Sequence, residues 1–249
     1  RKTITDLVIG ANAIHVGLGK LFDNITIGTL GVDGNPNYVV EGGILYNADK
    51  TEISYFPGSF TGELVIADGT KTITSGLYKN KTGITSVVIP ASVTRIEDSA
   101  FSGCTGITKV TFLASEENLT VCARAFEGCT SLNSLEIPAR VSEWGAGVLV
   151  GCVSLTEVTL ETGSAALSIE SGVIYNADKT EIYDCVTAGE RAVVIPEGVT
   201  TIGAGLFANS KITSVTIPST VTTIGDEAFK SCDKLDTVTF ANGSVLTTI

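Results

Sequence analysis

The chain contains no methionine and only one histidine and one tryptophan among its 249 residues. With a single imidazole, His15, most mechanisms that need a histidine base, a histidine–cysteine pair or a multi-histidine metal site are excluded. The remaining residues assemble into no set of nucleophile, base and orienting group. We therefore expect a protein that is not an enzyme, with no catalytic residue, metal or cofactor, and with His15 on its surface.

Charge and long apolar runs are scarce as well. Charged residues make up 17% of the chain and hydrophobic residues 43%, which predicts a folded core rather than disorder. No apolar run approaches the roughly 18 residues that a membrane helix needs, so we expect a soluble protein without membrane insertion. The net charge of −11 repels phosphate backbones and argues against nucleic acid as a partner.

The ends of the sequence are typical of an excerpt or a processed chain. Arg1 opens no charged-then-apolar leader, and residues 240–249 match residues 112–121, so the last repeat stops midway. We expect further residues in the natural protein, or a covered edge, and a targeting or anchoring segment outside the sequence shown.

What the chain does have is self-similarity with a period near 23 residues. Residues 87–104 and 215–232 share Val-x-Ile-Pro, then Ala-Phe, then cysteine, at the same spacing. Near the N-terminus, residues 9–16 align with residues 89–96, and Leu21-Phe22 takes the place of Ala100-Phe101. The residues that end successive strands, with spacings of 23, 23, 25, 23, 35, 22 and 23, are Ile66, Ile89, Phe112, Ile137, Leu160, Ile195, Ile217 and Phe240.

Each unit is predicted to start with a short strand that has one buried side. In the unit at residues 212–232, Pro218 ends the strand because it removes a donor from the ladder. Residues 225–229 form a turn or a single short helical turn that brings Phe229 into the core. One unit cannot bury its apolar side alone, so the units must stack. The predicted fold is a mainly β repeat solenoid with a parallel sheet, one domain over residues 1–249, with about nine units and a truncated last one.

A longer duplication is superimposed on the repeats. Residues 42–53 return 129 positions later as residues 171–182, each copy with an Asn-Ala-Asp-Lys turn between two apolar runs. Asparagine and aspartate tolerate tight turns and bond them locally, so we predict β-hairpin insertions near residues 35–60 and 168–190. These insertions explain the spacing of 35 and a counterpart between Ile27 and Ile66.

The pattern Leu-x-x-Val-x-Ile-Pro-x-x-Val-x-x-Ile-Gly-x-x-Ala-Phe-x-x-Cys, as in residues 212–232, resembles the BspA-type leucine-rich repeat. The resemblance implies a curved solenoid on secreted or surface-attached proteins, mostly bacterial, with roles in adhesion. It implies a partner that is a protein or a glycan on host or microbial surfaces. The alternative is a structural spacer or stalk segment of a larger surface protein, with no ligand of its own.

Several polar motifs have a structural and a chemical interpretation. Cys104, Cys129, Cys152 and Cys232 recur in register, which favours a ladder of buried thiols and leaves disulfide pairing open. Residues 33–35, Asp-Gly-Asn, carry hard oxygen ligands but are more typical of a turn. Residues 17–20, Gly-Leu-Gly-Lys, lack the full spacing of a phosphate loop.

The candidate partner-binding residues fall into two groups. Twelve of eighteen outward positions on six strands are Ser or Thr and none is aromatic, so charged Lys109, Glu136 and Glu157 stand out there. The aromatic residues gather instead in the two insertions. These candidates are Tyr46, Tyr55, Phe56, Phe60, Tyr175 and Tyr183. The alternative is that these rings pack the insertions against the solenoid.

Overall fold

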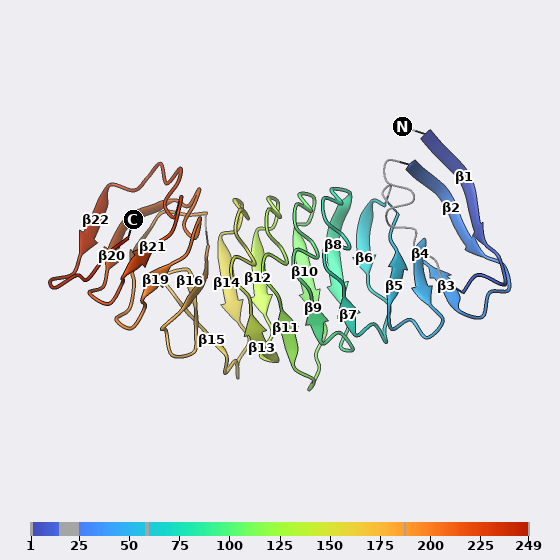
Figure 1. Cartoon of the computed structure of the whole chain (residues 1–249), viewed down its shortest axis with the longest axis horizontal. Coiled ribbons are helices and arrows are strands. Elements are labelled where there is room, and N and C mark those ends of the chain that lie inside the picture. Colours follow the sequence, from blue (N-terminus) through green and yellow to red (C-terminus); the bar gives the residue numbers. More distant parts are fainter. Residues whose placement is uncertain (1, 15–24, 58–59, 187, 249) are drawn as a thin grey trace.

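The computed structural model describes residues 2–14, 25–57, 60–186 and 188–248. Its strands stack one behind another along the long axis of the molecule, with the N-terminal and C-terminal strands at opposite ends (Figure 1). The described residues contain strands and turns and no helix. The predicted solenoid is confirmed, and of the two forms expected for the corner of each unit, the turn is the one found.

Two parallel columns of strands form the walls of the solenoid. The first column contains β6 (Gly62–Val65), β8 (Ile84–Ile89), β10 (Lys109–Phe112), β12 (Ser134–Ile137), β14 (Glu157–Leu160), β18 (Arg191–Val194), β20 (Ile212–Ile217) and β22 (Thr237–Phe240). The second contains β7 (Thr72–Ile73), β9 (Arg95–Ile96), β11 (Leu119–Val121), β13 (Val141–Trp144), β19 (Thr201–Ile202) and β21 (Thr223–Ile224). Val87 pairs with Val110 and Val215 with Val238, so the spacing of 23 in the sequence is the register of the sheet.

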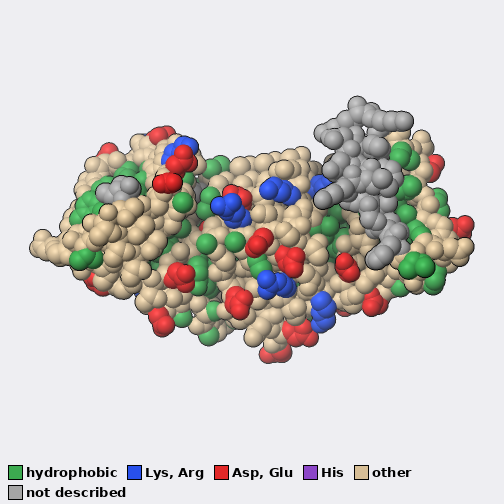
Figure 2. Space-filling view, in the orientation of Figure 1, with side chains coloured by type: hydrophobic (Ala, Val, Ile, Leu, Met, Phe, Trp, Pro, Cys, Tyr) green, Lys and Arg blue, Asp and Glu red, His purple; other side chains and the backbone are tan. Residues whose placement is uncertain are grey.

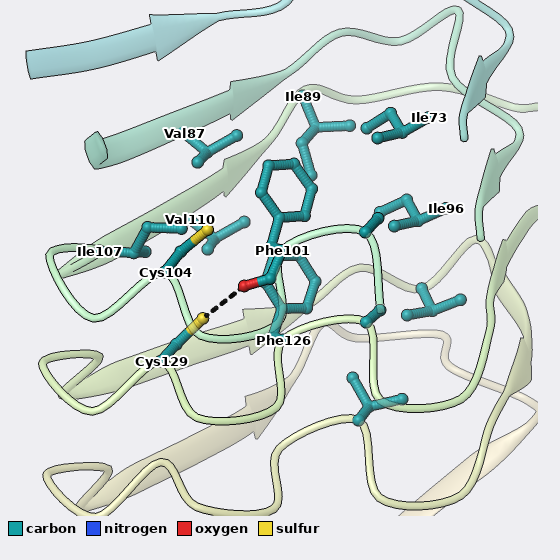
Figure 3. Close-up of a cluster of buried hydrophobic side chains, with 14 of the residues drawn as sticks. Ile73, Val87, Ile89, Ile96, Phe101, Cys104, Ile107, Val110, Phe126 and Cys129 are labelled. Atoms are coloured by element: carbon teal, nitrogen blue, oxygen red, sulfur yellow. Dashed lines mark hydrogen bonds between the residues drawn. The ribbon is translucent and has the colours of Figure 1, made fainter. Parts of the chain in front are cut away.

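The core lies between the two columns and is built from columns of identical side chains (Figure 3). Phe101 and Phe126 stack with ring centroids 5.0 Å apart and planes 3° from parallel. Tyr78 continues the stack at 4.8 Å from Phe101, and Phe56 meets Tyr78 edge-on at 4.7 Å. Because each ring is covered by the same ring of the next unit, burial of one unit depends on its neighbour.

The recurring cysteines form the predicted ladder of buried thiols. The Sγ of Cys104 donates to the Tyr78 carbonyl at 2.9 Å, and the Sγ of Cys129 donates to the Phe101 carbonyl at 3.4 Å (Figure 3). Cys152 and Cys232 repeat this bond one ring position further along their own stacks. All six cysteines are free thiols. Burial raises the pKa of Cys104 to about 11 and that of Cys152 to about 12, so both thiols stay protonated at neutral pH.

Glycine permits the close approach of neighbouring units at one corner. A Cβ added to Gly106 would lie 2.3 Å from the Thr82 carbonyl oxygen and 2.7 Å from that of Ile84. No side chain fits at those distances, so the Thr-Gly-Ile sequence before each strand is a packing requirement.

Both insertions are antiparallel, and each has three strands rather than the two of a hairpin. The first contains β3 (Tyr38–Glu41), β4 (Ile44–Asn47) and β5 (Ile53–Tyr55), and the second β15 (Leu167–Glu170), β16 (Val173–Asn176) and β17 (Ile182–Cys185). Asn47 bonds its turn through Thr51 and Glu52, and Asn176 does so through Thr180 and Glu181. The predicted turn chemistry is therefore confirmed in both copies.

The N-terminal strands extend the same register. β1 (Lys2–Ile9) pairs in parallel with β2 (Ile25–Val32), and Ile9 lies opposite Val32. Val32, and not Ile27, therefore ends this strand, and its distance to Ile66 is 34 residues, close to the 35 at the second insertion. His15, the Gly-Leu-Gly-Lys motif at residues 17–20 and Leu21-Phe22 lie outside the described residues.

The Asp-Gly-Asn motif serves the backbone, as a turn interpretation requires. The Nδ2 of Asn35 donates to the carbonyls of Gly10 and Ala13 at 2.7 and 2.9 Å, and its Oδ1 accepts from the Asn37 N–H at 2.8 Å. Across residues 2–14, 25–57, 60–186 and 188–248, no group of three or more potential metal-ligating side chains occurs. Over the same residues, no helix has the length and apolar character to cross a membrane.

Candidate functional site: a gap in the strand column

The first strand column is interrupted between β10 and β12. β10 pairs with β8 and β12 pairs with β14, but β10 and β12 share no ladder. In the second column β11 pairs with both β9 and β13, so the same units remain stacked on that side. The interruption coincides with the spacing of 25 between Phe112 and Ile137, two residues longer than the usual 23. The extra residues lie in the segment 113–118, which displaces one wall while the other stays in register.

The interruption leaves backbone groups of β10 without a strand partner. In paired units, the residue at the strand end turns both its N–H and its C=O toward the next unit: the Ile66 N–H donates to Val88, and Ile89 accepts from Leu113. Phe112 holds this position in β10. Because backbone groups alternate in direction along a parallel strand, those of Phe112 and Val110 face the gap. A free strand edge is a template for pairing with another chain.

A cavity of about 720 Å³ opens at the gap. Its walls come from β10, the segment 113–118, β12 and the turn after β12. Leu113 lines it with 45% of its surface exposed, which is unusual for leucine in this otherwise well-buried core. The charged residues that line it are Lys109, Glu116, Glu136, Arg140 and Glu161. Figure 2 shows charged side chains of both signs over the central units of the molecule.

Arg140 is the most constrained of these charged residues. Its Nη1 donates to the Val93 carbonyl at 2.8 Å and lies 3.4 Å from the Glu117 carbonyl, so it ties three consecutive units together. Its Nε and Nη2 are buried and bond no atom of the described residues. Burial lowers the pKa of Arg140, with Glu117 acting in the opposite direction, and the guanidinium keeps its charge at neutral pH. Buried charged donors without a partner are costly, so this pair requires an explanation.

The strand-face candidates Lys109, Glu136 and Glu157 are exposed. Lys109 and Glu136 line the cavity from opposite walls, whereas Glu157 lies on β14, where it is paired with Ser134. The structure therefore brings two of the three together at one site. Their role in partner binding stays a prediction.

Most of the aromatic candidates are buried and do not form a surface. Tyr46, Tyr55, Phe56 and Tyr175 lie in the cores of the insertions or of the adjoining units. A partner cannot reach these four rings in this structure, because covering them is what attaches the insertions to the solenoid. This corrects their assignment as contact residues and favours the packing alternative. Phe60 and Tyr183 are half-buried at the edge of the same core.

Sequence reasoning missed Arg140, Leu113 and Glu116. No residue type or motif marks them, because arginine, leucine and glutamate are ordinary residues in turns. The spacing of 25 in place of 23 was the available indication, since two extra residues in one unit must be accommodated at one wall.

A second unusual polar group, Asp184, is enclosed where the second insertion meets the solenoid. The Trp144 Nε1–H donates to its Oδ2 at 2.9 Å and the Leu149 N–H donates to its Oδ1 at 3.0 Å. Burial raises the pKa of Asp184 to about 7, against the lowering effect of these bonds. The carboxyl group is completely buried, so it holds two elements together and faces no substrate.

Comparison with proteins of known sequence and structure agrees with this architecture. The family model of the BspA type leucine rich repeat region matches residues 71–188 and 187–249, in 6 copies. No curated protein matches the chain.

Three solved structures are similar in fold. The pneumococcal vaccine antigen PcpA is 17% identical, with a TM-score of 0.54 over 83% of this chain and 70% of PcpA. A leucine-rich repeat protein from Eubacterium ventriosum is 18% identical, with a TM-score of 0.47 over 75% of this chain. A leucine rich cell surface protein from Faecalibacterium prausnitzii is 21% identical, with a TM-score of 0.40 over 86% of this chain and 82% of that protein. The chain spans 65% of the Eubacterium protein's length.

At these identities the similar structures describe a fold and not a function. The family assignment rests on the repeat itself, since the family model covers more than half of the sequence and its boundaries follow the parallel strand columns. The chain belongs to the BspA-type leucine-rich repeat family.

Proposed function

We propose that this chain is the recognition segment of a secreted or cell-surface protein, and that it binds a macromolecular partner at the gap between β10 and β12. The observation that carries the proposal is the cavity of about 720 Å³ at the one interruption of the sheet that no insertion explains. Its volume lies in the roughly 300–1,000 Å³ range of ligand-binding sites. Lys109, Glu136 and Leu113 supply charge and apolar surface there, on a strand face otherwise dominated by Ser and Thr.

The proposed role is binding rather than catalysis. The thiols of Cys104, Cys152 and Cys185 are buried with raised pKa values, so they are poor nucleophiles. Asp184 is buried away from the cavity. A secreted or surface location is supported by the likeness to PcpA, which is described as a vaccine antigen and shares the fold at a TM-score of 0.54.

A spacer role is the second candidate. It is favoured by the composition of the strand face, where twelve of eighteen outward positions are Ser or Thr and none is aromatic. Tight protein interfaces are usually centred on Trp, Tyr or Arg, so most of this face offers no anchor.

A binding panel separates the two candidates. The whole chain is tested for binding to extracellular-matrix proteins and glycans, beside a gap variant with Lys109→Ser and Glu136→Ser. The matched control carries Lys79→Ser and Glu143→Ser, which change the same residue types at exposed positions outside the cavity. We expect the chain to bind at least one member of the panel, and the gap variant to lose about tenfold or more in Kd while the control keeps its affinity. No binding across the panel, or equal binding by both variants, contradicts the proposal, and the first result favours the spacer.

A further inference from the structure

Building on the proposed recognition function, we propose that the gap binds an extended peptide segment of a partner protein. The peptide main chain pairs with the free edge of β10, and an acidic side chain of the peptide forms an ion pair with Arg140. Three independent features of the gap carry this assignment: unpaired backbone groups, unpaired guanidinium donors and the distribution of charge around them.

The unpaired backbone groups require a partner with its own regular donors and acceptors. Both N–H and C=O of Val110 and Phe112 face the gap, at the alternating spacing of a strand. An extended peptide presents groups of the same kind at about 3.3 Å per residue, so it can continue the ladder that β12 does not. A saccharide has hydroxyl groups but no such alternation of amide donors and carbonyl acceptors.

The unpaired donors of Arg140 require a carboxylate. Nε and Nη2 lie on the same edge of the guanidinium and together form the fork that binds both oxygens of one carboxylate. Nη1 is already anchored on Val93, so the fork is held in orientation before a ligand arrives. The segment 113–118 covers the guanidinium, with its only printed polar contact the 3.4 Å approach of Nη1 to the Glu117 carbonyl. Displacing this weakly held segment opens the fork to the cavity.

The remaining charges favour a peptide over a simple anion. Glu116 and Glu136 line the cavity, and neither takes part in an ion pair within the described residues. They would repel a purely anionic ligand, whereas a peptide can carry a basic side chain toward them and an acidic one toward Arg140. Leu113, exposed in the cavity wall, offers contact for an apolar side chain between the two.

The test uses an array of acetylated, amidated heptapeptides of alternating valine and threonine, into which one aspartate and one lysine are placed in every combination. Kd values are then measured for the best peptide, for its aspartate-to-asparagine analogue and for its form with a free C-terminal carboxylate. The protein is used as wild type, Arg140→Lys, Leu113→Ser and the control Arg124→Gln, an exposed arginine outside the cavity. Melting temperatures verify that each variant folds, and amide hydrogen exchange is followed at Val110 and Phe112.

We expect the asparagine analogue and Arg140→Lys each to raise Kd about tenfold or more, and the two losses not to add. Leu113→Ser tests the same cavity without touching the guanidinium, so it keeps the proposal open to test if Arg140→Lys unfolds. Bound peptide should slow exchange at Val110 and Phe112, and Arg124→Gln should change nothing. Failure of every array peptide to bind, equal Kd for the aspartate and asparagine forms, or dependence on the C-terminal carboxylate alone overturns the inference. If the extracellular panel yields a glycan ligand bound at the gap, the proposed function stands and this inference fails.

Discussion

The two insertions have nearly the same sequence but join the solenoid in different ways. In both, an asparagine bonds the turn, and a lysine of the turn, Lys50 or Lys179, pairs with a glutamate on the first strand. The copies diverge at the end of the third strand. Tyr55 and Phe56 in the first copy correspond to Asp184 and Cys185 in the second, 129 residues later.

This divergence matches what each insertion meets. Phe56 caps one end of the ring stack by packing edge-on against Tyr78. At the other end the stack stops at Leu149, and Asp184 accepts the Leu149 N–H and the Trp144 Nε1–H there. The two insertions therefore close opposite ends of one stack, the first with an apolar ring and the second with a buried carboxyl group. A duplicated segment keeps its own turn but takes its docking residues from the neighbouring unit.

The largest effect is expected from removing the apolar cap. Phe56→Ala should lower the free energy of unfolding by about 3–5 kcal/mol, because a nearly fully buried ring leaves a cavity against Tyr78. Urea denaturation followed by circular dichroism measures the loss. The matched control is Cys185→Ala at the corresponding position, where fewer atoms are removed. If the two variants lose equal stability, Phe56 does not cap the stack.

The carboxyl closure is expected to make stability depend on pH. The folded-state pKa of Asp184 is raised from 3.8 to about 7, so between these values the folded chain holds a proton that the unfolded chain has released. The stability contributed by Asp184 is complete below about pH 4 and is lost as the pH rises through about 7, with a slope of up to about 1.4 kcal/mol per pH unit.

Asp184→Asn should flatten this part of the pH profile, since the amide does not titrate. Melting temperatures of the two proteins between pH 4 and 8 measure the difference. Asp178→Asn, at an exposed position of the same insertion, serves as the control and should leave the profile unchanged. Parallel profiles for wild type and Asp184→Asn would refute the role given to the buried carboxyl group.

The smallest effects, of opposite sign, are expected at one duplicated tyrosine. The hydroxyl of Tyr46 hydrogen bonds with the Ala67 backbone, whereas the buried hydroxyl of Tyr175 bonds no atom of the described residues. Tyr46→Phe should therefore cost about 1 kcal/mol of stability, and Tyr175→Phe should add about as much. Thermal unfolding of the two variants side by side provides the measurement. The same sign for both would mean that their environments do not differ as the structure indicates.

The repeat made most of the fold predictable. The period of 23 became the register of the parallel strands, the recurring cysteines became a ladder of thiols, and the Asn-Ala-Asp-Lys turns formed as expected. Each of these features depends on local chemistry or on a residue meeting its own copy in the next unit. The third strand of each insertion was not anticipated, because its residues form no motif and are defined only by what they pair with.

The candidate site was far less predictable. Lys109 and Glu136 were identifiable as charges on a polar face, but their convergence on one cavity depends on β10 and β12 failing to pair. The aromatic residues of the insertions were ranked as contacts because rings often anchor interfaces, yet the rings are needed to cover the ends of the core.

The sequence by itself determined the solenoid, because a period of 23 with one apolar side per unit can bury that side only by stacking. It also determined the turns of the insertions, whose asparagine side chains bond within five residues. Only the tertiary structure decided where the stack opens and how it is closed. Those outcomes depend on contacts between units, where two extra residues separate one pair of strands and a buried carboxyl group or a ring covers whichever surface the neighbouring unit presents.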